Sequence, residues 1–349
     1  MEKSDILRSF LEKGYQIDLE TLNFFSKNER LLQKFMEDIE KKTAPSTITK
    51  DFVDLILEKD IDIILHQREK RTMTAEDLAK ILFNKYTIIK KIIATHLDLI
   101  NLLSINKVSE KTKKFSLIGI VTLIDEVTRN ITVADDTGEI ILSIDQKILA
   151  DILLNDVLGF ICENNGRMHV TSIVFPDIPL RRVVKNITDD KKIIFTEKIT
   201  EAVLQYCEKE KNPCYIFTFS QHGEEDKYPQ NVKTIHADNN SPTTAIIAKN
   251  FFIFLFNGDF LNKYIHDREI DEFMVSLLKK RYLNASNAFD CNFINEAFIL
   301  ENIPDVIVAK GLKDAIQTNY KGTTVLTLSE NVFWVINLKT REIIKLSHT

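Results

Sequence analysis

Apolar residues recur at every third or fourth position through the first part of the chain. Ile6 and Phe10 show this spacing near the start, and Phe35 and Ile39 show it further on. Such spacing gathers the apolar side chains on one face of a helix, so it predicts amphipathic helices. Pro45 interrupts the pattern, because the residue before a proline is disfavoured in the helical conformation. Helices are predicted to resume after this break.

A long helix is predicted to begin at Thr74, which follows a charged segment. Threonine is a favoured N-cap residue, and Asp77 lies three residues further on, where an acidic side chain can complete the cap. Helical spacing continues to about Leu99, and a polar linker follows at residues 107–114. We therefore expect a helical N-terminal domain over residues 1–110.

The pattern changes at Phe115, where short apolar runs rich in β-branched residues replace the helical spacing. Five such runs are present, at residues 117–122, 130–134, 139–142, 157–162 and 168–174. Turn sequences rich in glycine, aspartate and asparagine separate neighbouring runs. A helix-compatible segment at residues 146–154 lies between the third run and the fourth, which is the element order of an OB-fold barrel. The sequence predicts such a barrel over residues 111–187.

From residue 188 onward, short apolar strands alternate with helices. Strands are predicted at residues 193–195, 215–219, 251–256, 306–308, 324–326 and 332–335, and helices at residues 200–208, 271–280 and 310–318. Alternation of this kind indicates an α/β sandwich. The predicted fold class is a multidomain α+β protein, with a helical N-terminal domain, an OB-fold β-barrel and an α/β sandwich over residues 188–349.

Composition narrows the class of protein without pointing to a function. Hydrophobic residues make up 44% of the 349 residues, which is enough to bury sizeable cores. No apolar run approaches the roughly 18 residues that a membrane helix needs, and the chain opens with alternating charges rather than a signal peptide. The four cysteines form no C-x-x-C pair. We expect a cytoplasmic protein with no membrane contact and no disulfide framework.

Catalytic chemistry finds little support among the residues. The chain has nine glycines, no glycine-rich phosphate loop and no G-x-S-x-G motif. The histidines of the last region are His222, His236, His266 and His348, so residues 267–347 contain none. His222 and His236 lie in polar, loop-like sequence, where histidine is usually solvated, and His348 lies at a terminus that we expect to fray. We expect no catalytic residue and no cofactor.

Nucleic-acid binding is also poorly supported by charge. The net charge of the chain is −5, and residues 111–190 contain nine basic and twelve acidic residues. The aromatic residues available there for stacking on bases are Phe115, Phe160 and Phe175. The basic residues concentrate at the two ends of this region, at Lys111, Lys113, Lys114, Arg181, Arg182 and Lys185. They belong either to solvated linkers or to phosphate contacts made within a larger complex.

Several landmarks occur in an order that resembles a known family. They are Asp136-Thr137-Gly138, the segments 174–180 and 274–282, Tyr228-Pro229, Phe256-Asn257-Gly258 and Ile303-Pro304-Asp305-Val306. Spread over about 340 residues, they resemble the small subunit of the archaeal family D DNA polymerase, related to the B-subunits of eukaryotic replicative polymerases. The resemblance implies an OB-fold and a calcineurin-like phosphoesterase domain with two metal ions and 3′ to 5′ exonuclease activity. It also implies a large catalytic subunit as the partner.

Most ligands of that two-metal site are replaced in this sequence. The family's Asp-x-His motif falls on Glu197-Lys198-Ile199, its Gly-Asn-His-Asp motif keeps only Asn239, and its His-Gly motif becomes Asn257-Gly258. The stretch after residue 305 that should carry further histidines contains none before His348. Glu197, Asn239 and Asn257 are therefore interpreted as remnants of a degenerate metal site.

The sequence thus predicts a non-catalytic accessory subunit that scaffolds and stabilises the large subunit of a replicative DNA polymerase. It would contact DNA only through that complex. Two aromatic residues of a loop-like stretch, Phe289 and Phe293, are candidate anchors for the large subunit.

Two alternatives stay open. The first is an active metal-dependent exonuclease or phosphoesterase, whose site would be built from Glu197, His222, His236 and Asn239. The second is a free single-strand-binding OB protein. Metal-dependent activity distinguishes the first, and salt-dependent binding of the isolated chain distinguishes the second.

Overall fold

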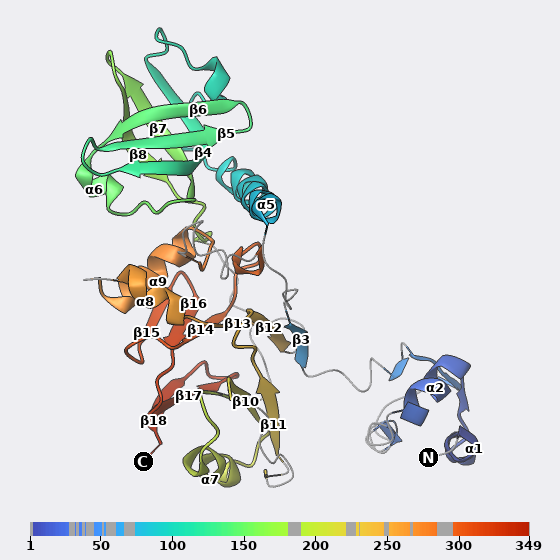
Figure 1. Ribbon diagram of the computed structural model, residues 1–349. Coiled ribbons are helices and arrows are strands. Elements are labelled where there is room, and N and C mark those ends of the chain that lie inside the picture. The colour runs from blue at the N-terminus through green and yellow to red at the C-terminus, as the bar shows by residue number, and fades with distance from the viewer. Residues whose placement is uncertain are drawn as a thin grey trace. The chain divides into compact units, whose positions relative to one another are not determined.

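The computed structural model describes residues 3–27, 32, 35–36, 39, 45–50, 52–53, 61–65, 74–180, 190–220, 228–229, 231–247, 251–265, 268–284 and 296–348. The protein is a mixed α+β fold with several sheets (Figure 1). It divides into two compact units, Met1–Asp62 with Ile247–Lys249 and Ile63–Ile246 with Asn250–Thr349. None of the helices in the described ranges is long and apolar enough to cross a membrane.

The first unit confirms the helix predicted from Ile6 and Phe10, whereas the segments predicted around Phe35 and Ile39 and after Pro45 lie largely outside the described residues. Its elements are α1 (Lys3–Glu12), β1 (Gln16–Ile17), α2 (Leu19–Lys27) and β2 (Thr47–Ile48). The apolar face of α1 buries Ile6 and Phe10, and the Phe10 and Phe25 ring centres lie 5.8 Å apart. The two short strands pair in parallel. A pattern of helical spacing does not reveal such two-residue strands.

The predicted helix start at Thr74 is confirmed. Helix α5 (Ala75–Ile93) begins there with a complete capping box, in which Asp77 N–H donates to Thr74 Oγ1 at 3.2 Å and Thr74 N–H donates to Asp77 Oδ2 at 3.0 Å. The buried face of α5 packs its Ile89 against Ile118 and Val157. Helix α5 therefore belongs to the second unit. The domain boundaries expected at residues 110 and 187 remain a prediction.

A closed five-stranded barrel follows α5 and the single turn η1 (Ile105–Lys107). Its strands are β4 (Lys114–Asp125), β5 (Asn130–Asp135), β6 (Gly138–Ile144), β7 (Val157–Asn164) and β8 (Met168–Val174), in the order β4-β5-β6-β8-β7. They coincide with the five predicted runs, and α6 (Gln146–Leu149) lies between the third and fourth strands. A Cβ at Gly119 would overlap the Val133 side chain and lie 2.8 Å from the Ala134 carbonyl oxygen. Strands β4 and β5 therefore approach each other so closely at this position that it requires glycine.

Two mixed sheets are built largely from residues 190–348. The first has the order β11-β10-β9-β17-β18. Its strands are β9 (Lys192–Thr196), β10 (Cys214–Thr218), β11 (Val232–His236), β17 (Val332–Asn337) and β18 (Ile343–Ser347). Strands β9, β10 and β11 run parallel to one another.

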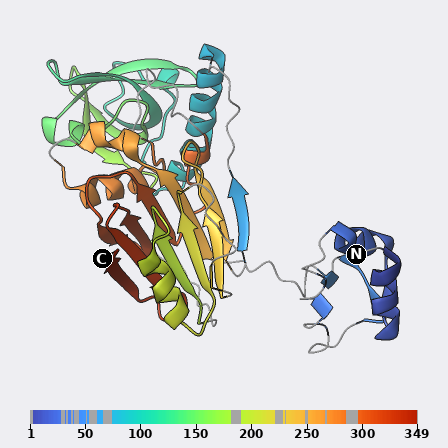
Figure 2. The ribbon, with the colours of Figure 1, turned by 60° about the horizontal axis from the view of Figure 1, so that its bottom comes forward.

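The second sheet has the order β15-β16-β14-β13-β12-β3. Its strands are β3 (Ile61–Leu65), β12 (Thr243–Ile247), β13 (Phe251–Asn257), β14 (Val306–Lys310), β15 (Gln317–Tyr320) and β16 (Thr323–Thr327). Strands β13, β14 and β16 run parallel. Figure 2 shows β3, in blue, along the edge of this sheet.

Helices and single turns connect and cover these strands. They are α7 (Glu201–Lys209), η3 (Asp259–Leu261), α8 (Asn262–Ile265), α9 (Ile270–Lys279) and η4 (Glu296–Phe298). Helix α9 buries Phe273 and Leu277 in one cluster with Phe256 of β13 and Ile307 of β14. The helices predicted at residues 200–208 and 271–280 are thus confirmed by α7 and α9.

The helix predicted at residues 310–318 is wrong. Strand β14 continues to Lys310, Gly311 adopts the left-handed conformation with φ 80°, and β15 begins at Gln317. Left-handed glycine ends regular structure, and the antiparallel ladder between β15 and β16 supplies hydrogen bonds that a local helix would lose. Tertiary pairing outweighs the local propensity here.

A buried cluster of charges connects α5, the barrel and the end of α9. Lys85 on α5 is buried, and its Nζ donates to the Asn155 carbonyl oxygen at 2.8 Å and lies 3.6 Å from the centre of the Tyr282 ring. Lys280 pairs with Asp156 at 2.7 Å, and both side chains are buried. Burial lowers the pKa of Lys85 to about 7; the charge of Asp156 raises it and the charge of Lys280 lowers it further. This joint therefore contains a lysine that titrates near neutral pH.

Candidate functional site

The three residues interpreted from the sequence as remnants of a metal site lie where parallel strands end. Glu197 directly follows β9, Asn239 lies three residues after β11, and Asn257 is the last residue of β13. In open sheets the segments beyond the carboxyl ends of parallel strands form the usual ligand-binding crevice. The structure brings all three remnants to one place, around the turn at Lys310 and Gly311 that follows β14.

Lys310 supplies a positive charge at this place. Its Nζ donates a hydrogen bond to Asn239 Oδ1 at 2.7 Å and lies 5.6 Å from the centre of the Phe219 ring. The Asn239 Nδ2 group donates to the Phe219 carbonyl oxygen at 3.0 Å, which turns the amide oxygen toward the ammonium. Lys310 is also in register with Asn257 across the β13–β14 pair. The ammonium is therefore held by the sheets that carry the remnants.

Asp259 is a second acidic residue of the site, beside Glu197. It opens η3 directly after Asn257-Gly258, and its N–H donates to Asn257 Oδ1 at 3.2 Å. Gly311 lies against it in the left-handed conformation, and a Cβ at that position would overlap Asp259 Oδ1. The Gly258 N–H donates to the Lys310 carbonyl oxygen at 2.7 Å. The turns after β13 and β14 are thus packed so closely that position 311 favours glycine.

Glu197 is half-buried within this arrangement. Burial raises the pKa of its carboxyl, while the hydrogen bond from the Gly311 N–H and the charge of Lys310 lower it, and the net direction is upward. A buried carboxylate is costly unless a hydrogen bond or an opposite charge accompanies it. Gly311 and Lys310 supply both from the chain itself.

The site opens into a cavity of about 1150 Å³. Charged residues of both signs line it, namely Glu197, Lys198, Asp259, Arg268, Glu269, Lys310, Lys313, Asp314 and Glu330. A two-metal phosphoesterase site needs roughly six side-chain ligands. In the part of the chain that the structure describes, no three His, Cys, Asp or Glu side chains converge on one point that could hold a metal ion. These residues do not fit the two metal ions that the family resemblance implies.

The histidines of the alternative metal site occupy other environments. His222 lies outside the described residues. His236, expected in a loop, is instead the last residue of β11, and its Nδ1 lies 2.9 Å from the Ser220 carbonyl oxygen. His348, expected at a frayed end, lies 2.8 Å from Thr200 Oγ1, because β18 pairs with β17 and carries the chain to this point. The expectation of a loop position for His236 and that of a frayed end for His348 are both wrong. Each side chain instead lies within hydrogen-bond distance of another residue.

The remaining site predictions are only partly within the described ranges. Lys111 and Lys113 are exposed just before the barrel, and Lys114, the first residue of β4, forms an ion pair with Glu163 at 2.7 Å. The other residues predicted to contact nucleic acid or the partner are Arg181, Arg182, Lys185, Phe289 and Phe293, and all of them lie outside the described residues. The nucleic-acid and partner assignments therefore stay predictions.

Lys310 and Asp259 are the site residues that sequence reasoning missed. One signal could have indicated them, since each ends or follows a fully apolar run, residues 306–309 and 251–256. Polar residues at the ends of buried parallel strands mark candidate sites. What the sequence could not supply is the register that places Lys310 beside Asn257.

Comparison with known proteins assigns neither a family nor a function to this chain. No protein-family model and no curated protein matches the sequence. Among solved structures, the chain is similar to a Thermotoga maritima protein determined by solution NMR as a structural-genomics target. That similarity has 11% identity and a TM-score of 0.26, and it covers 45% of this chain and 98% of the other. A TM-score this low does not indicate a shared fold.

Proposed function

We propose that this chain is a non-catalytic accessory subunit of a replicative DNA polymerase of the family D type. Its role is to scaffold and stabilise the large catalytic subunit, and it contacts DNA through that complex. The strand order β4-β5-β6-β8-β7, with α6 between β6 and β7, supports an OB-fold for the barrel. The two mixed sheets that follow support a calcineurin-like domain. This is the domain order that the collinear sequence landmarks imply.

The observation that carries the proposal is the position of Lys310. Its ammonium lies 2.7 Å from Asn239 and close to Glu197, among the residues that would otherwise ligate divalent cations. A fixed positive charge repels a divalent cation, and at these separations the repulsion is large wherever water is partly excluded. The cavity beside Glu197 and Asn239 therefore favours the ammonium of Lys310 over bound metal ions. A phosphoesterase-like domain without its metals can still present a protein-binding surface.

The test is co-expression with the large family D polymerase subunit encoded in the same genome. We expect the two chains to co-elute in gel filtration as a stable complex, and primer extension by the large subunit to depend on this chain. A matched variant is Lys310→Ala, which changes the charge of the site without adding a Cβ to the tight turn at Gly311. It should leave the complex and its primer extension unchanged, because the proposed role is non-catalytic. A monomer that neither binds the large subunit nor changes its primer extension would refute the proposal.

A further inference from the structure

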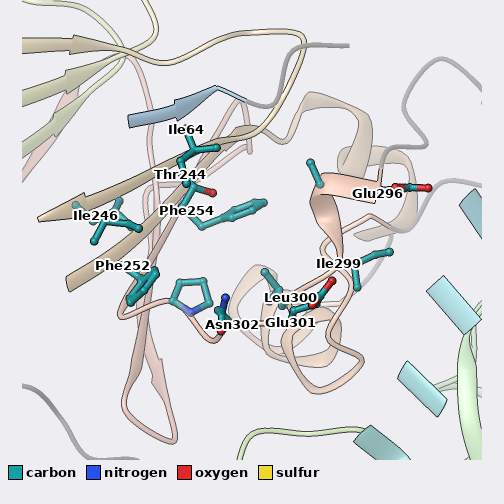
Figure 3. A pocket seen from close by; sticks show the side chains of 13 residues that line it. Ile64, Thr244, Ile246, Phe252, Phe254, Glu296, Ile299, Leu300, Glu301 and Asn302 are labelled. Atoms are coloured by element: carbon teal, nitrogen blue, oxygen red, sulfur yellow. The ribbon is translucent and has the colours of Figure 1, made fainter. Parts of the chain in front are cut away.

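A groove lies on the second sheet of the second unit, away from the Lys310 site. It has a volume of about 650 Å³ and runs between β12 and β13 on one side and the segment 296–304 on the other. Figure 3 shows the Phe254 ring pointing from its strand into the space, with Ile299 and Leu300 on the opposite wall. Ile64 and Ile246 extend the apolar lining toward the edge of the sheet. Most residues that line the groove are therefore apolar, with polar groups among them.

Strand β3 forms the edge of the sheet at this groove. It is the last strand in the order β15-β16-β14-β13-β12-β3, so among the described strands none pairs with its outer side. Ile63 and Ile64 are 45% and 46% exposed, and successive residues of a strand point to opposite faces. Both faces of this edge strand thus expose an isoleucine. An exposed, apolar edge strand is a ready template for pairing with another chain.

Charge gives the groove a second property. The charged residues that line it are Glu296 and Glu301, both exposed, and the described lining includes no basic residue. Asn302 adds a neutral polar group beside them. We call Glu296 and Glu301 the acidic rim of the groove. An occupant with a lysine or arginine next to its apolar side chains would complement this acidic rim, whereas an acidic occupant would be repelled.

We propose that this edge binds an extended segment of a partner polypeptide by strand addition. The segment pairs with the outer side of β3, about 4.8 Å away, and places an apolar side chain beside Ile64 at the mouth of the groove. A lysine or arginine of the segment lies near Glu296 and Glu301. Main-chain hydrogen bonds supply affinity, and the groove and its acidic rim supply specificity. The inference needs no polymerase, so it stands apart from the function proposed above.

The experiment selects peptides from a phage-displayed library of random 12-residue sequences against the full-length chain. We expect the selected peptides to alternate apolar or β-branched residues with polar ones, to contain lysine or arginine, and to lack proline in the strand. In fluorescence anisotropy they should bind Ile64→Asp and Glu301→Lys at least tenfold more weakly than the unmodified chain. Ile141→Asp is the matched control, since Ile141 is an exposed isoleucine of the barrel, and it should leave the affinity unchanged.

Thermal unfolding of each variant checks that the substitutions leave the fold intact. Should Ile64→Asp fail to fold, the exposed Glu301→Lys still tests the acidic rim. Three results would overturn the inference: no enriched peptides, peptides that bind all variants equally, or acidic peptides that prefer the unmodified chain. Self-association of the chain that disappears in Ile64→Asp would also overturn it, because the occupant would then be a second copy rather than a partner segment.

Discussion

At the scale of single residues, Gly311 tests how tightly the Lys310 site is built. We expect Gly311→Ala to destabilise the second unit, because the left-handed backbone costs an L-residue about 1–2 kcal/mol and the new Cβ displaces Asp259. Gly166→Ala is the matched control, since Gly166 is also left-handed but has nothing within 4 Å of the place that a Cβ would take. Urea unfolding followed by circular dichroism should show a larger loss for Gly311→Ala. Equal losses would mean that the overlap with Asp259 is relieved without cost.

A second prediction at this scale concerns metal ions. Because Lys310 occupies the cleft, the purified chain should release no nucleotides from single-stranded DNA with Mn²⁺, and calorimetry should detect no Mn²⁺ binding at the site. Lys310→Ala removes the repelling charge, so it should bind Mn²⁺ more tightly than the unmodified chain. Release of nucleotides that is stimulated by Mn²⁺, lost in Asn239→Ala and kept in Asn302→Ala would support the exonuclease alternative.

At the scale of elements, the buried Lys85 makes the joint between α5, the barrel and α9 sensitive to pH. The folded pKa of about 7 lies below the ordinary value of 10.5, so between these values the unfolded chain binds the extra proton. The contribution of Lys85 therefore destabilises the fold fully below pH 7, and the penalty is relieved as the pH rises toward 10.5.

The measurement compares the unfolding free energy of the chain with that of Lys85→Met across this pH window. We expect the unfolding free energy of Lys85→Met to exceed that of the unmodified chain most at pH 7, and this difference to shrink as the pH rises. Lys91→Met, at an exposed position of the same helix, should parallel the unmodified chain at every pH. A constant difference between the unmodified chain and Lys85→Met would show that Lys85 does not titrate in this window.

The elements also show which structure a sequence reveals and why. All five barrel strands were predictable. The central strands β9, β13 and β14 were predictable too, because both faces of these three strands are apolar. The pattern missed β3, β11, β15 and β18, which are the outermost strands of the two sheets, and also β12, which lies between β13 and β3. An edge strand packs against one neighbour only, and it tolerates polar residues such as those of β15.

The candidate site also has a part that the sequence predicts and a part that it does not. Glu197, Asn239 and Asn257 could be located along the chain from the resemblance, but their common neighbour could not. Lys310 reaches them only through the pairing of β13 with β14 and the approach of the two sheets. Such proximity depends on register, which local sequence does not encode.

At the scale of the whole molecule, the net charge of −5 limits direct binding of nucleic acid. We expect the isolated chain to bind a labelled single-stranded 30-mer with a Kd of about 10⁻⁴ to 10⁻⁶ M at physiological salt, the range of non-specific contacts. Lys114 is already paired with Glu163, so it is less available for a phosphate contact. Fluorescence anisotropy over a range of salt concentrations is the measurement.

Paired charge reversals refine this prediction. Lys111→Glu together with Lys113→Glu should weaken the residual binding, whereas Lys339→Glu, an exposed lysine in the turn between β17 and β18, should change it less. Submicromolar binding with a steep salt dependence would instead favour the single-strand-binding alternative.

The ammonium of Lys310 is covalently part of the chain, unlike a bound ion. Chelators cannot remove it, and the metal supply of a cell cannot limit it. A domain organised around such a charge should fold equally well when manganese or zinc is scarce, so EDTA should leave its melting temperature unchanged. The same feature makes metal-dependent chemistry hard to acquire at this place, because it would require the loss of this lysine together with the gain of several ligands.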